Sequence, residues 1–378
     1  MNKALVPQIR FKGFTYAWEL KRLGDVVILN RYSQIGATEL EAYRLRTGEI
    51  TLLPSSKNYD WKTSKAKVPY GLVNDGEIIT VGRARNANTK YAKGLFISSQ
   101  NHIIESFNIK QLLTKFLFYI IKNNDHKFYT SETTYPIFTR MDFEQLPINH
   151  PKQIIEQQKI VSVFNIVDSL LTLHQRKCDA LKKIKQTLLE KMFPVEGSNV
   201  PSIRFAGFTY AWELKRLGDL VTIDCGSLDA NKAVKDGVYN FYTSGVDVFK
   251  INDFAFEGDS ITIAGNGVNM GFLHLAEGKF NAYQRTYVLQ NIKIVREFLY
   301  FSLWTNFWNE CQKYAKLGAI PYIVYEQISD FQISSPQLPE QNKIAQTFST
   351  LDSLLTLHQR KCEKLKKIKQ ELLNKMFV

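Results

Sequence analysis

The chain of 378 residues contains only four cysteines, and no two of them form a CxxC pair. This usage fits a reducing cytoplasm. No apolar run is long enough to span a membrane, and the amino-terminal stretch MNKALVPQIRF lacks the apolar core of a signal peptide. At this length we expect two or more domains.

Familiar catalytic motifs are also missing. The sequence has no NPPY tetrapeptide of an amino-methyltransferase, no GxxxxGK[ST] phosphate loop and no HExxH. One candidate remains, in which Asp259 and Glu277 would hold Mg²⁺ while Lys279 supported an attacking water, as in metal-dependent nucleases. The alternative is that residues 277–279 form a hairpin turn. We favour the turn, because the first half of the chain has no equivalent triad.

Charge of one sign is in excess. Lys and Arg number 49 against 36 Asp and Glu, which gives a formal net charge of +13. A basic surface predicts an anionic partner, and nucleic acid is the first candidate.

A long repeat dominates the sequence. Residues 156–193 read EQQKIVSVFNIVDSLLTLHQRKCDALKKIKQTLLEKMF, and residues 340–377 read EQNKIAQTFSTLDSLLTLHQRKCEKLKKIKQELLNKMF. Apolar residues recur at alternating steps of four and three, apart from Lys369, and no Gly or Pro interrupts either copy. This pattern predicts a coiled-coil helix of about five heptads, roughly 55 Å long. Two copies in one chain suggest that each helix is the other's partner.

The expected contact between the two helices is an a/d seam. Its residues are Phe164, Leu171, His174, Cys178, Leu181, Phe348, Leu355, His358, Cys362 and Leu365. Two His and two Cys of this set are spaced i, i+4, so an antiparallel pair of helices could bring them together as a zinc site. Core packing is the other interpretation and the one we favour, since Cys acts as a small hydrophobe at a seam position.

A second repeat precedes each variable segment. Residues 6–25 and 200–219 differ only at Gln8/Ser202 and Lys12/Ala206. The variable segments, about 26–150 and 220–339, look like distant relatives of one β-rich fold. The run GEIITVG at residues 76–82 parallels GDSITIAG at residues 258–265, and each continues into a polar, Gly- or Asn-rich loop. Strands and an aromatic helix follow in both. A shared scaffold with divergent inserts is expected when two similar sites read different targets.

These duplicated elements together resemble the specificity subunit of bacterial type I restriction-modification systems. The resemblance rests on the repeated RFxGFTYAWELKRLGD, on the closing segments PIFTRMDFEQLPINHPKQIIEQQKI and IPxxxxxQISDFQISSPQLPEQNKI, and on the two long helices. It covers essentially the whole chain. It implies a mixed α/β fold with an internal two-fold repeat, in which two β-rich target-recognition domains are separated by an antiparallel pair of long coiled-coil helices. The domains expected are residues 1–150 and 195–339, and the helices are residues 151–194 and 340–378.

The resemblance also implies a function. Such a subunit is non-catalytic and reads a bipartite double-stranded DNA target, one half-site per domain. It docks two methyltransferase subunits, which methylate adenine, and through them restriction subunits. S-adenosylmethionine, ATP and Mg²⁺ are then expected on the partner subunits, and no cofactor or metal in this chain. A stand-alone methyltransferase or nuclease, and an adaptor that binds only protein, are the rival interpretations.

Two loops carry residue types that read base edges, because Arg pairs with guanine and Asn with adenine. The candidate DNA-contacting residues are Arg83, Arg85, Asn86, Asn88 and Lys90 in the first domain, and Asn266, Asn269, Gln284 and Arg285 in the second. Asn and Gly in loops also serve simply to make turns. The lysines near the helix ends either contact phosphates or a partner, or form a solvated face. Trp18 and Trp212 belong to the repeated scaffold, so we expect them in the core.

Overall fold

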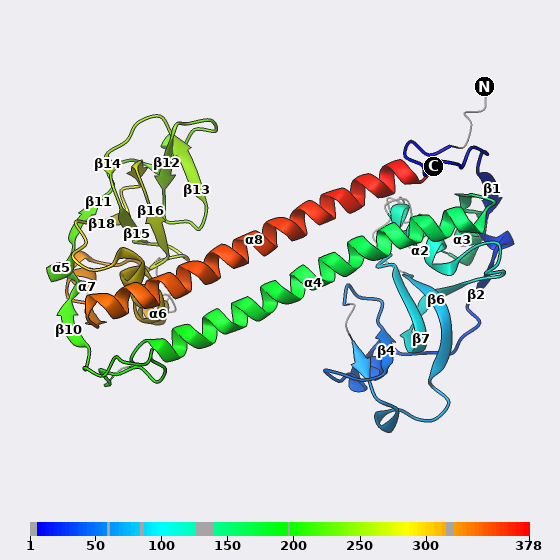
Figure 1. Cartoon of the computed structure of the whole chain (residues 1–378), viewed down its shortest axis with the longest axis horizontal. Helices are drawn as coiled ribbons and strands as arrows, with labels where there is room; N and C mark the ends of the chain where they lie inside the picture. The colour runs from blue at the N-terminus through cyan, green and yellow to red at the C-terminus, as the bar shows by residue number, and fades with distance from the viewer. Residues whose placement is uncertain (1–5, 59–60, 84–86, 126–138, 196, 315–320) are drawn as a thin grey trace. The chain divides into compact units, whose positions relative to one another are not determined.

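The computed structural model describes residues 6–58, 61–83, 87–125, 139–195, 197–314 and 321–378 (Figure 1). The chain divides into two compact units. Unit 1 consists of Met1–Leu173 and Lys361–Val378, and unit 2 of His174–Arg360. The long helices α4 (Ile154–Met192) and α8 (Leu338–Met376) each contribute to both units. Among the described residues no helix has the length and apolar character needed to cross a membrane.

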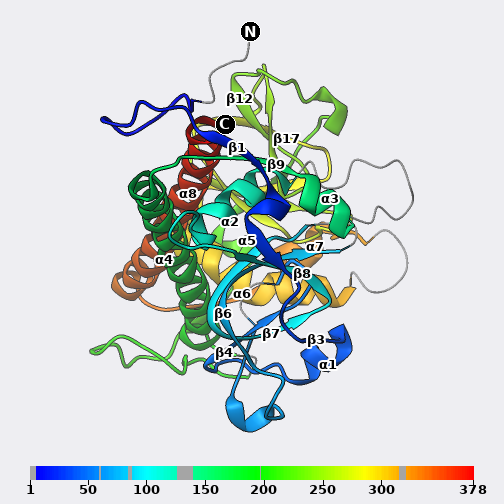
Figure 2. The same cartoon turned by 90° about the vertical axis from the view of Figure 1, so that its right-hand side faces the viewer.

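Unit 1 is built on a seven-stranded sheet with the order β2-β8-β6-β7-β4-β5, to which β3 adds by pairing with β7. Its strands are β2 (Val27–Leu29), β3 (Gln34–Ile35), β4 (Ile50–Leu53), β5 (Lys62–Thr63), β6 (Asn74–Gly82), β7 (Lys90–Ser99) and β8 (Asn101–Ser106). Its shorter helices are α1 (Ala37–Ala42), α2 (Thr114–Asn123) and α3 (Arg140–Gln145). Helix α2 lies against this sheet (Figure 2), and its apolar residues pack with those of β6 and β8 in one core.

Unit 2 contains two four-stranded sheets, with the orders β11-β18-β15-β16 and β13-β12-β17-β14. The first sheet holds β11 (Thr222–Cys225), β15 (Ser260–Ala264), β16 (Leu273–Ala276) and β18 (Thr286–Gln290). The second holds β12 (Tyr239–Tyr242), β13 (Val248–Ile251), β14 (Phe256–Glu257) and β17 (Lys279–Ala282). The helices are α5 (Leu217–Leu220), α6 (Arg296–Tyr314) and α7 (Tyr325–Ser329).

The repeated scaffold forms the same two-stranded ribbon in each unit. In unit 1, β1 (Glu19–Arg22) pairs antiparallel with β9 (Pro147–His150). In unit 2, β10 (Glu213–Arg216) pairs antiparallel with β19 (Gln332–Ser335). Each ribbon therefore brackets one variable segment at both of its ends.

Duplicated side chains also fix the start of each long helix. Arg10 makes a two-pronged ion pair with Glu156, in the first turn of α4, with N–O distances of 2.7 and 2.9 Å. Arg204 does the same with Glu340, in the first turn of α8, at 2.7 Å for both contacts. Carboxylates also favour the positive end of the helix dipole. These contacts explain why the Arg and Glu recur in both copies.

The residue that follows each long helix completes the core of one unit. In unit 1, Phe377 packs against Trp18, Phe116 and Phe164 with ring centroids 5.4–6.2 Å apart. In unit 2, Phe193 packs likewise against Trp212, Phe298 and Phe348 at 5.7–6.2 Å. Both tryptophans are 3% exposed, so the prediction that they belong to the core is confirmed.

Within each unit the paired segments of α4 and α8 run antiparallel. Asp168 meets Lys369 in unit 1, and Phe164 lies nearer the chain end, against Phe377. Of the ten predicted seam residues, Phe164, Cys178, Phe348, Leu355 and Cys362 are buried, and Leu171, His174, Leu181, His358 and Leu365 are half-buried. The expected fold class is therefore confirmed: two mixed α/β units and an antiparallel pair of long helices.

Candidate nucleic-acid interface

The predicted reading loop of unit 1 follows strand β6. Arg83 is exposed, and its Nη2 donates to the backbone oxygen of Asn101 at 3.2 Å. The remaining guanidinium N–H groups can therefore face a base edge or a phosphate. Arg85 and Asn86 lie outside the described residues. They stay predictions.

Two other predicted residues of this loop support it from within. Asn88 is half-buried with a positive φ of 40°, and its amide nitrogen donates to the Ser55 oxygen at 2.7 Å. Lys90 is 2% exposed, and its ammonium donates to the oxygens of Pro54 and Ser56 at 2.5 and 2.6 Å. Burial lowers the pKa of Lys90 to about 8. The interior position of Lys90 is that of a group holding two loops together, so we place it outside the proposed contact surface.

Gln34 fixes the backbone on which Arg83 rests. Its side-chain amide donates to the Asn101 oxygen at 2.9 Å and accepts from the Asn101 nitrogen at 3.1 Å. The Asn101 amide is itself buried and donates to the Leu53 oxygen at 2.9 Å. The exposed Gln100 precedes Asn101, in the turn between β7 and β8. This surface thus combines an exposed Arg and an exposed Gln on a rigid base.

The predicted residues of unit 2 come together on one surface built from five chain segments. Backbone hydrogen bonds of 2.7–2.9 Å join them: Tyr283 to Tyr242, Gln284 to Leu228, Gly265 to Arg285, Ile323 to Gly265 and Gly267 to Pro321. Because the backbone polar groups are used in these links, the loops hold a defined shape. We call these segments, residues 228–229, 242–245, 265–269, 283–286 and 321–323, the unit-2 loop surface.

Polar side chains project from this surface. Gln284 and Arg285 are exposed, while Asn266 and Asn269 are half-buried. The Gln284 amide nitrogen donates to Asp229 at 3.0 Å, which leaves its amide oxygen as an acceptor. The Cys225 thiol donates to the Gln284 backbone oxygen at 3.2 Å, and burial raises the pKa of this thiol, so it stays protonated at neutral pH. The surface offers both donors and acceptors to a partner.

Strand register makes the two surfaces equivalent. At the ends of their ladders, Gly82 pairs with Asn101 in unit 1 and Ala264 with Thr286 in unit 2. In each unit the predicted loop therefore begins beside the turn that precedes the paired strand. That turn carries Gln100 before β8 in unit 1, and Arg285 before β18 in unit 2. The parallel expected between residues 76–82 and 258–265 matches this register. Equivalent placement of divergent side chains suits two sites of one kind.

Sequence reasoning missed two exposed residues at these surfaces. Gln100 could have been found by aligning the run ISSQNHIIES with NAYQRTYVLQ. In that alignment Gln100 falls on Gln284, next to Arg285. Tyr322 is 62% exposed and pairs with Asn266 in an isolated antiparallel β-bridge, so it lies directly on the unit-2 loop surface. No local pattern marks Tyr322, because its position depends on a contact between segments far apart in the sequence.

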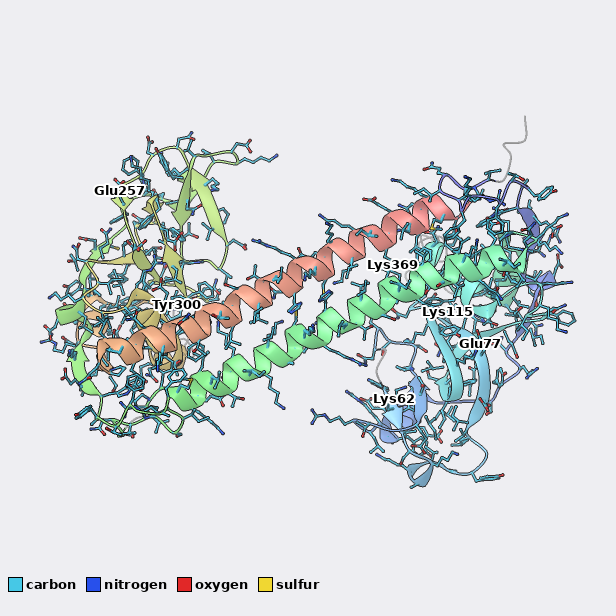
Figure 3. All side chains as sticks on the ribbon, in the orientation of Figure 1. Lys62, Glu77, Lys115, Glu257, Tyr300 and Lys369 are labelled. Carbon is cyan, nitrogen blue, oxygen red and sulfur yellow. The ribbon has the colours of Figure 1, made fainter. Side chains whose placement is uncertain are left out.

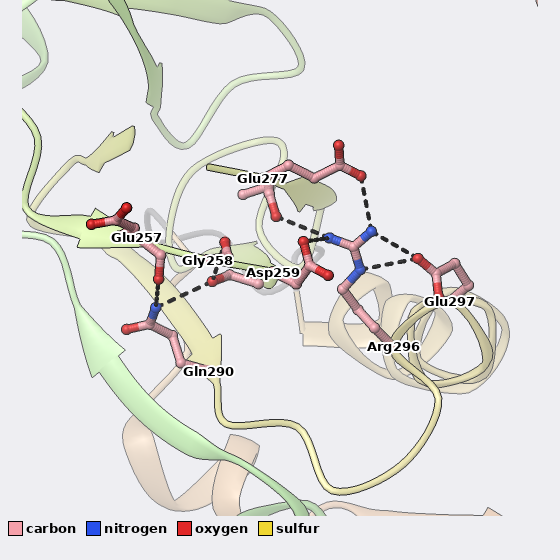
Figure 4. Close-up of polar contacts among 9 residues, drawn as sticks. Glu257, Gly258, Asp259, Glu277, Gln290, Arg296 and Glu297 are labelled. Carbon is pink, nitrogen blue, oxygen red and sulfur yellow. Dashed lines mark hydrogen bonds and ion pairs between the residues drawn. The ribbon is translucent and has the colours of Figure 1, made fainter. Parts of the chain in front are cut away.

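The nuclease interpretation fails on geometry (Figure 4). The guanidinium of Arg296 holds both carboxylates, with contacts of 3.2 Å to Asp259 and 2.9 Å to Glu277, and a further contact of 2.7 Å to Glu297. The Lys279 ammonium lies 4.4 Å from the Phe254 ring centroid. An arginine thus takes the place that a metal ion would need.

The turn at Glu277 and Gly278 differs from the expected one. Gly278 has a φ of +64°, which favours glycine, so the prediction of a turn is confirmed. However, β16 pairs with β15 and β17 pairs with β12 and β14. The hairpin was wrong: the turn carries the chain from one sheet to the other.

The seam histidines contact each other directly. The Nδ1 atoms of His174 and His358 lie 3.0 Å apart, so one ring donates and the other accepts. In the described part of the chain no group of three or more His, Cys, Asp or Glu is arranged to hold a metal ion. The geometry favours core packing of this seam over a zinc site.

The lysines near the helix ends divide into two kinds. Lys185 and Lys369 are half-buried and form ion pairs with Asp352 and Asp168, both at 2.5 Å. Lys182, Lys183, Lys366 and Lys367 are exposed. Only the exposed set can meet phosphates or a partner.

A family model described as the type I restriction modification DNA specificity domain matches residues 17–183 and again residues 210–367. Each match contains one of the two surfaces described above. The repeat seen in the sequence is therefore a repeat of this domain.

Individual specificity subunits are also similar to this chain. The EcoDI specificity subunit of a type I restriction enzyme from Escherichia coli is 40% identical over 140 residues, which are 37% of this chain and 31% of that protein. The MjaVIII specificity subunit from Methanocaldococcus jannaschii is 22% identical over 94% of this chain and 91% of its own length. The type I restriction-modification S subunit from M. genitalium has a similar fold, with a TM-score of 0.75, 17% identity and 99% of both chains covered.

Proposed function

The chain belongs to the type I restriction-modification DNA specificity family and is a DNA-recognition subunit, and from this premise we propose that it reads a bipartite target with one half-site per domain. The first half-site would be read by the surface around Arg83 and Gln100. The second would be read by the unit-2 loop surface, through Asn266, Gln284 and Arg285, with Asn269 beside them.

The observation that carries this proposal is the equivalent placement of two different loop surfaces. Strand pairs with matching register place Arg83 and Gln100 at the end of one ladder in unit 1, and Gly265 and Arg285 at the end of one ladder in unit 2. The scaffold around them is duplicated almost without change, whereas the exposed side chains differ. Base edges in the major groove are read by such Arg, Asn and Gln side chains. The net charge of +13 favours the DNA backbone as the partner of the remaining basic surface.

We further propose that the chain acts in a complex with two methyltransferase subunits and, through them, restriction subunits. S-adenosylmethionine, ATP and Mg²⁺ would then act on those partners. The exposed faces of α4 and α8 and the duplicated scaffold ribbons are the surfaces that both halves share. A pair of identical partner subunits needs such a repeated surface. The proposed boundaries are residues 1–150 and 195–339 for the domains, with residues 151–194 and 340–378 as the helices.

The decisive experiment selects bound sequences from randomised double-stranded DNA with the full-length chain, alone and together with a type I methyltransferase subunit. We expect two short conserved blocks separated by unread base pairs, and adenine methylation inside them only when the methyltransferase and S-adenosylmethionine are present. Methyl transfer or cleavage by the chain alone would support the stand-alone enzyme. A chain that binds the methyltransferase but no DNA sequence would be an adaptor, and the proposed function would be wrong.

A further inference from the structure

One contact on the unit-2 loop surface limits how its central amide can read a base. The Ser244 hydroxyl donates a hydrogen bond to the amide oxygen of Asn266 at 2.6 Å, and both residues are half-buried. In the described part of the chain, the Asn266 side chain makes no other hydrogen bond. An amide oxygen and nitrogen point in opposite directions, so the nitrogen is turned away from Ser244.

The backbone around Ser244 is held on both sides. The Tyr283 nitrogen donates to the Tyr242 oxygen at 2.9 Å, just before Ser244. The His274 ring donates from Nε2 to the Gly245 oxygen at 3.1 Å, just after it. Ser244 therefore presents its hydroxyl from a fixed position.

The backbone around Asn266 is held as firmly. The Gly265 oxygen accepts from the Ile323 nitrogen at 2.8 Å, and the Gly267 nitrogen donates to the Pro321 oxygen at 2.9 Å. Asn266 itself pairs with Tyr322 in an isolated β-bridge. Both ends of the contact are therefore fixed at a separation of 2.6 Å. Turning the amide around would make its nitrogen donate to the Ser244 hydroxyl oxygen, and this separation is shorter than an N–H···O bond prefers, so the amide oxygen stays toward Ser244.

The usual recognition of adenine by Asn uses both groups of the amide. That pairing needs the amide oxygen to accept from the adenine N6 amino group while the amide nitrogen donates to N7. Here Ser244 already occupies one of the two acceptor sites of this half-buried oxygen, whereas both N–H groups of the amide nitrogen remain for a base. A single donor suits the acceptors of the major groove, which are purine N7, guanine O6 and thymine O4.

We propose that Ser244 is a positioning residue that makes Asn266 a hydrogen-bond donor in DNA readout, so that unit 2 recognises an acceptor edge of one base. The inference rests on the proposed function, because it assumes that the unit-2 loop surface meets DNA bases. It differs from the sequence expectation, which paired Asn with adenine through both of its amide groups.

The test compares selected sequences for the full-length chain and four variants, in the complex that gives the unsubstituted chain its specific binding. Asn266→Ala locates the base pair, as the position where preference is lost. At that position the unsubstituted chain should disfavour cytosine by about fivefold. If the preferred base is adenine, removing its 6-amino group should leave binding unchanged, and replacing N7 by carbon should weaken it.

The other three variants test polarity. Asn266→Asp replaces the donor by an acceptor, so preference should move to cytosine, whose N4 amino group donates. Ser244→Ala frees the amide to turn, so discrimination at this one position should fall. Ser244→Thr keeps the hydroxyl and should keep the profile. Binding to non-specific DNA and the rest of the selected sequence should stay the same in all of them.

The outcomes separate the inference from the proposed function. If the unsubstituted chain selects no sequence, the proposed function fails and the inference falls with it. If it selects a site, but recognition at this position requires the adenine 6-amino group, only the inference is wrong. A uniform loss of affinity in Ser244→Ala, with an unchanged base profile, would also overturn it, since that is the signature of a merely structural serine.

Discussion

The ammonium nitrogen of Lys369 lies 2.5 Å from the Oδ1 atom of Asp168, on the seam between α8 and α4 within unit 1 (Figure 3). Tyr119 donates its hydroxyl hydrogen to the other carboxylate oxygen at 2.9 Å. Burial and, after it, the Asp168 charge raise the pKa of Tyr119, so its hydroxyl stays protonated and keeps donating. Polar residues at such positions fix the register of paired helices.

Removing the carboxylate should destabilise unit 1. In Asp168→Ala the Lys369 ammonium, whose side chain is 23% exposed, loses its ion-pair partner, and we expect the free energy of unfolding to fall by about 1–3 kcal/mol. Glu363→Ala removes the same charge from an exposed position of α8 and is the matched control. Urea unfolding measures both. Equal stability of the two variants would show that the pair contributes nothing.

The seam shows what sequence could and could not predict. Spacing of apolar residues predicted the two long helices and their pairing, because a stripe of this length must be covered, and the antiparallel direction was implied by the family resemblance. Lys369 broke that pattern and had no explanation, since its partner lies 201 residues away. Arg296 is a similar case: from the sequence, Asp259 and Glu277 resemble a metal site, and only the fold shows an arginine between them.

The two surfaces proposed to contact DNA also combine features that the sequence predicted with features that it did not. Repeated strands predicted where the loops begin, and the strand register agrees. The side chains that orient the loops come from distant segments: Gln34 reaches Asn101 from β3, which pairs with β7, and Ser244 reaches Asn266 although β12 and β15 belong to different sheets. Lys90 was predicted to contact DNA because it closes the Arg- and Asn-rich loop, yet it is buried as the first residue of β7. Local residue type does not report which face of a strand is buried.

Stability should depend on pH through His150, which is buried, and His274, which is half-buried. Burial lowers the pKa of His150 in unit 1 and of His274 in unit 2 from the ordinary value of 6.5. Below about pH 6.5 these histidines take up protons in the unfolded chain but stay neutral in the folded one. Their contribution to the free energy of unfolding is therefore fully present above that pH, and it is lost as the pH falls toward their lower pKa in the folded state. We expect the free energy of unfolding to decline between pH 7 and pH 5.

His274→Gln tests this directly. Glutamine keeps a donor for the Gly245 oxygen but does not titrate, so the decline with falling pH should become shallower. Denaturant unfolding at fixed ionic strength, from pH 5 to pH 7, gives the slope. An identical slope in the variant would mean that other groups cause the pH dependence.

Gln34 should matter for specificity as well as for stability. We expect Arg83→Ala to cost about 1–3 kcal/mol at the cognate first half-site. Gln34→Ala loosens the Asn101 backbone that Arg83 rests on, so it should weaken discrimination at the same base pair by a smaller amount. Lys366→Ala, on an exposed helix face, should lower affinity evenly on all sequences or leave it unchanged. Binding to cognate, mutated and random DNA separates these cases. If both Arg83→Ala and Gln34→Ala leave the ratio of specific to non-specific binding unchanged, the unit-1 surface does not read bases.

Specificity should be exchangeable one half-site at a time. The β10–β19 ribbon brackets the second variable segment, so residues 220–331 can be replaced by the matching segment of a relative without altering that ribbon. Ser335, Glu340 and Gln341, which fix the start of α8, also remain in place. The new chain should keep the first half-site and adopt the donor's second one, because each surface is built from residues of its own unit. The reciprocal exchange of residues 26–146, inside the β1–β9 ribbon, is the control and should change only the first half-site. Site selection on both chimaeras decides the matter: if either exchange rewrites both half-sites in a folded protein, the two units do not read DNA independently.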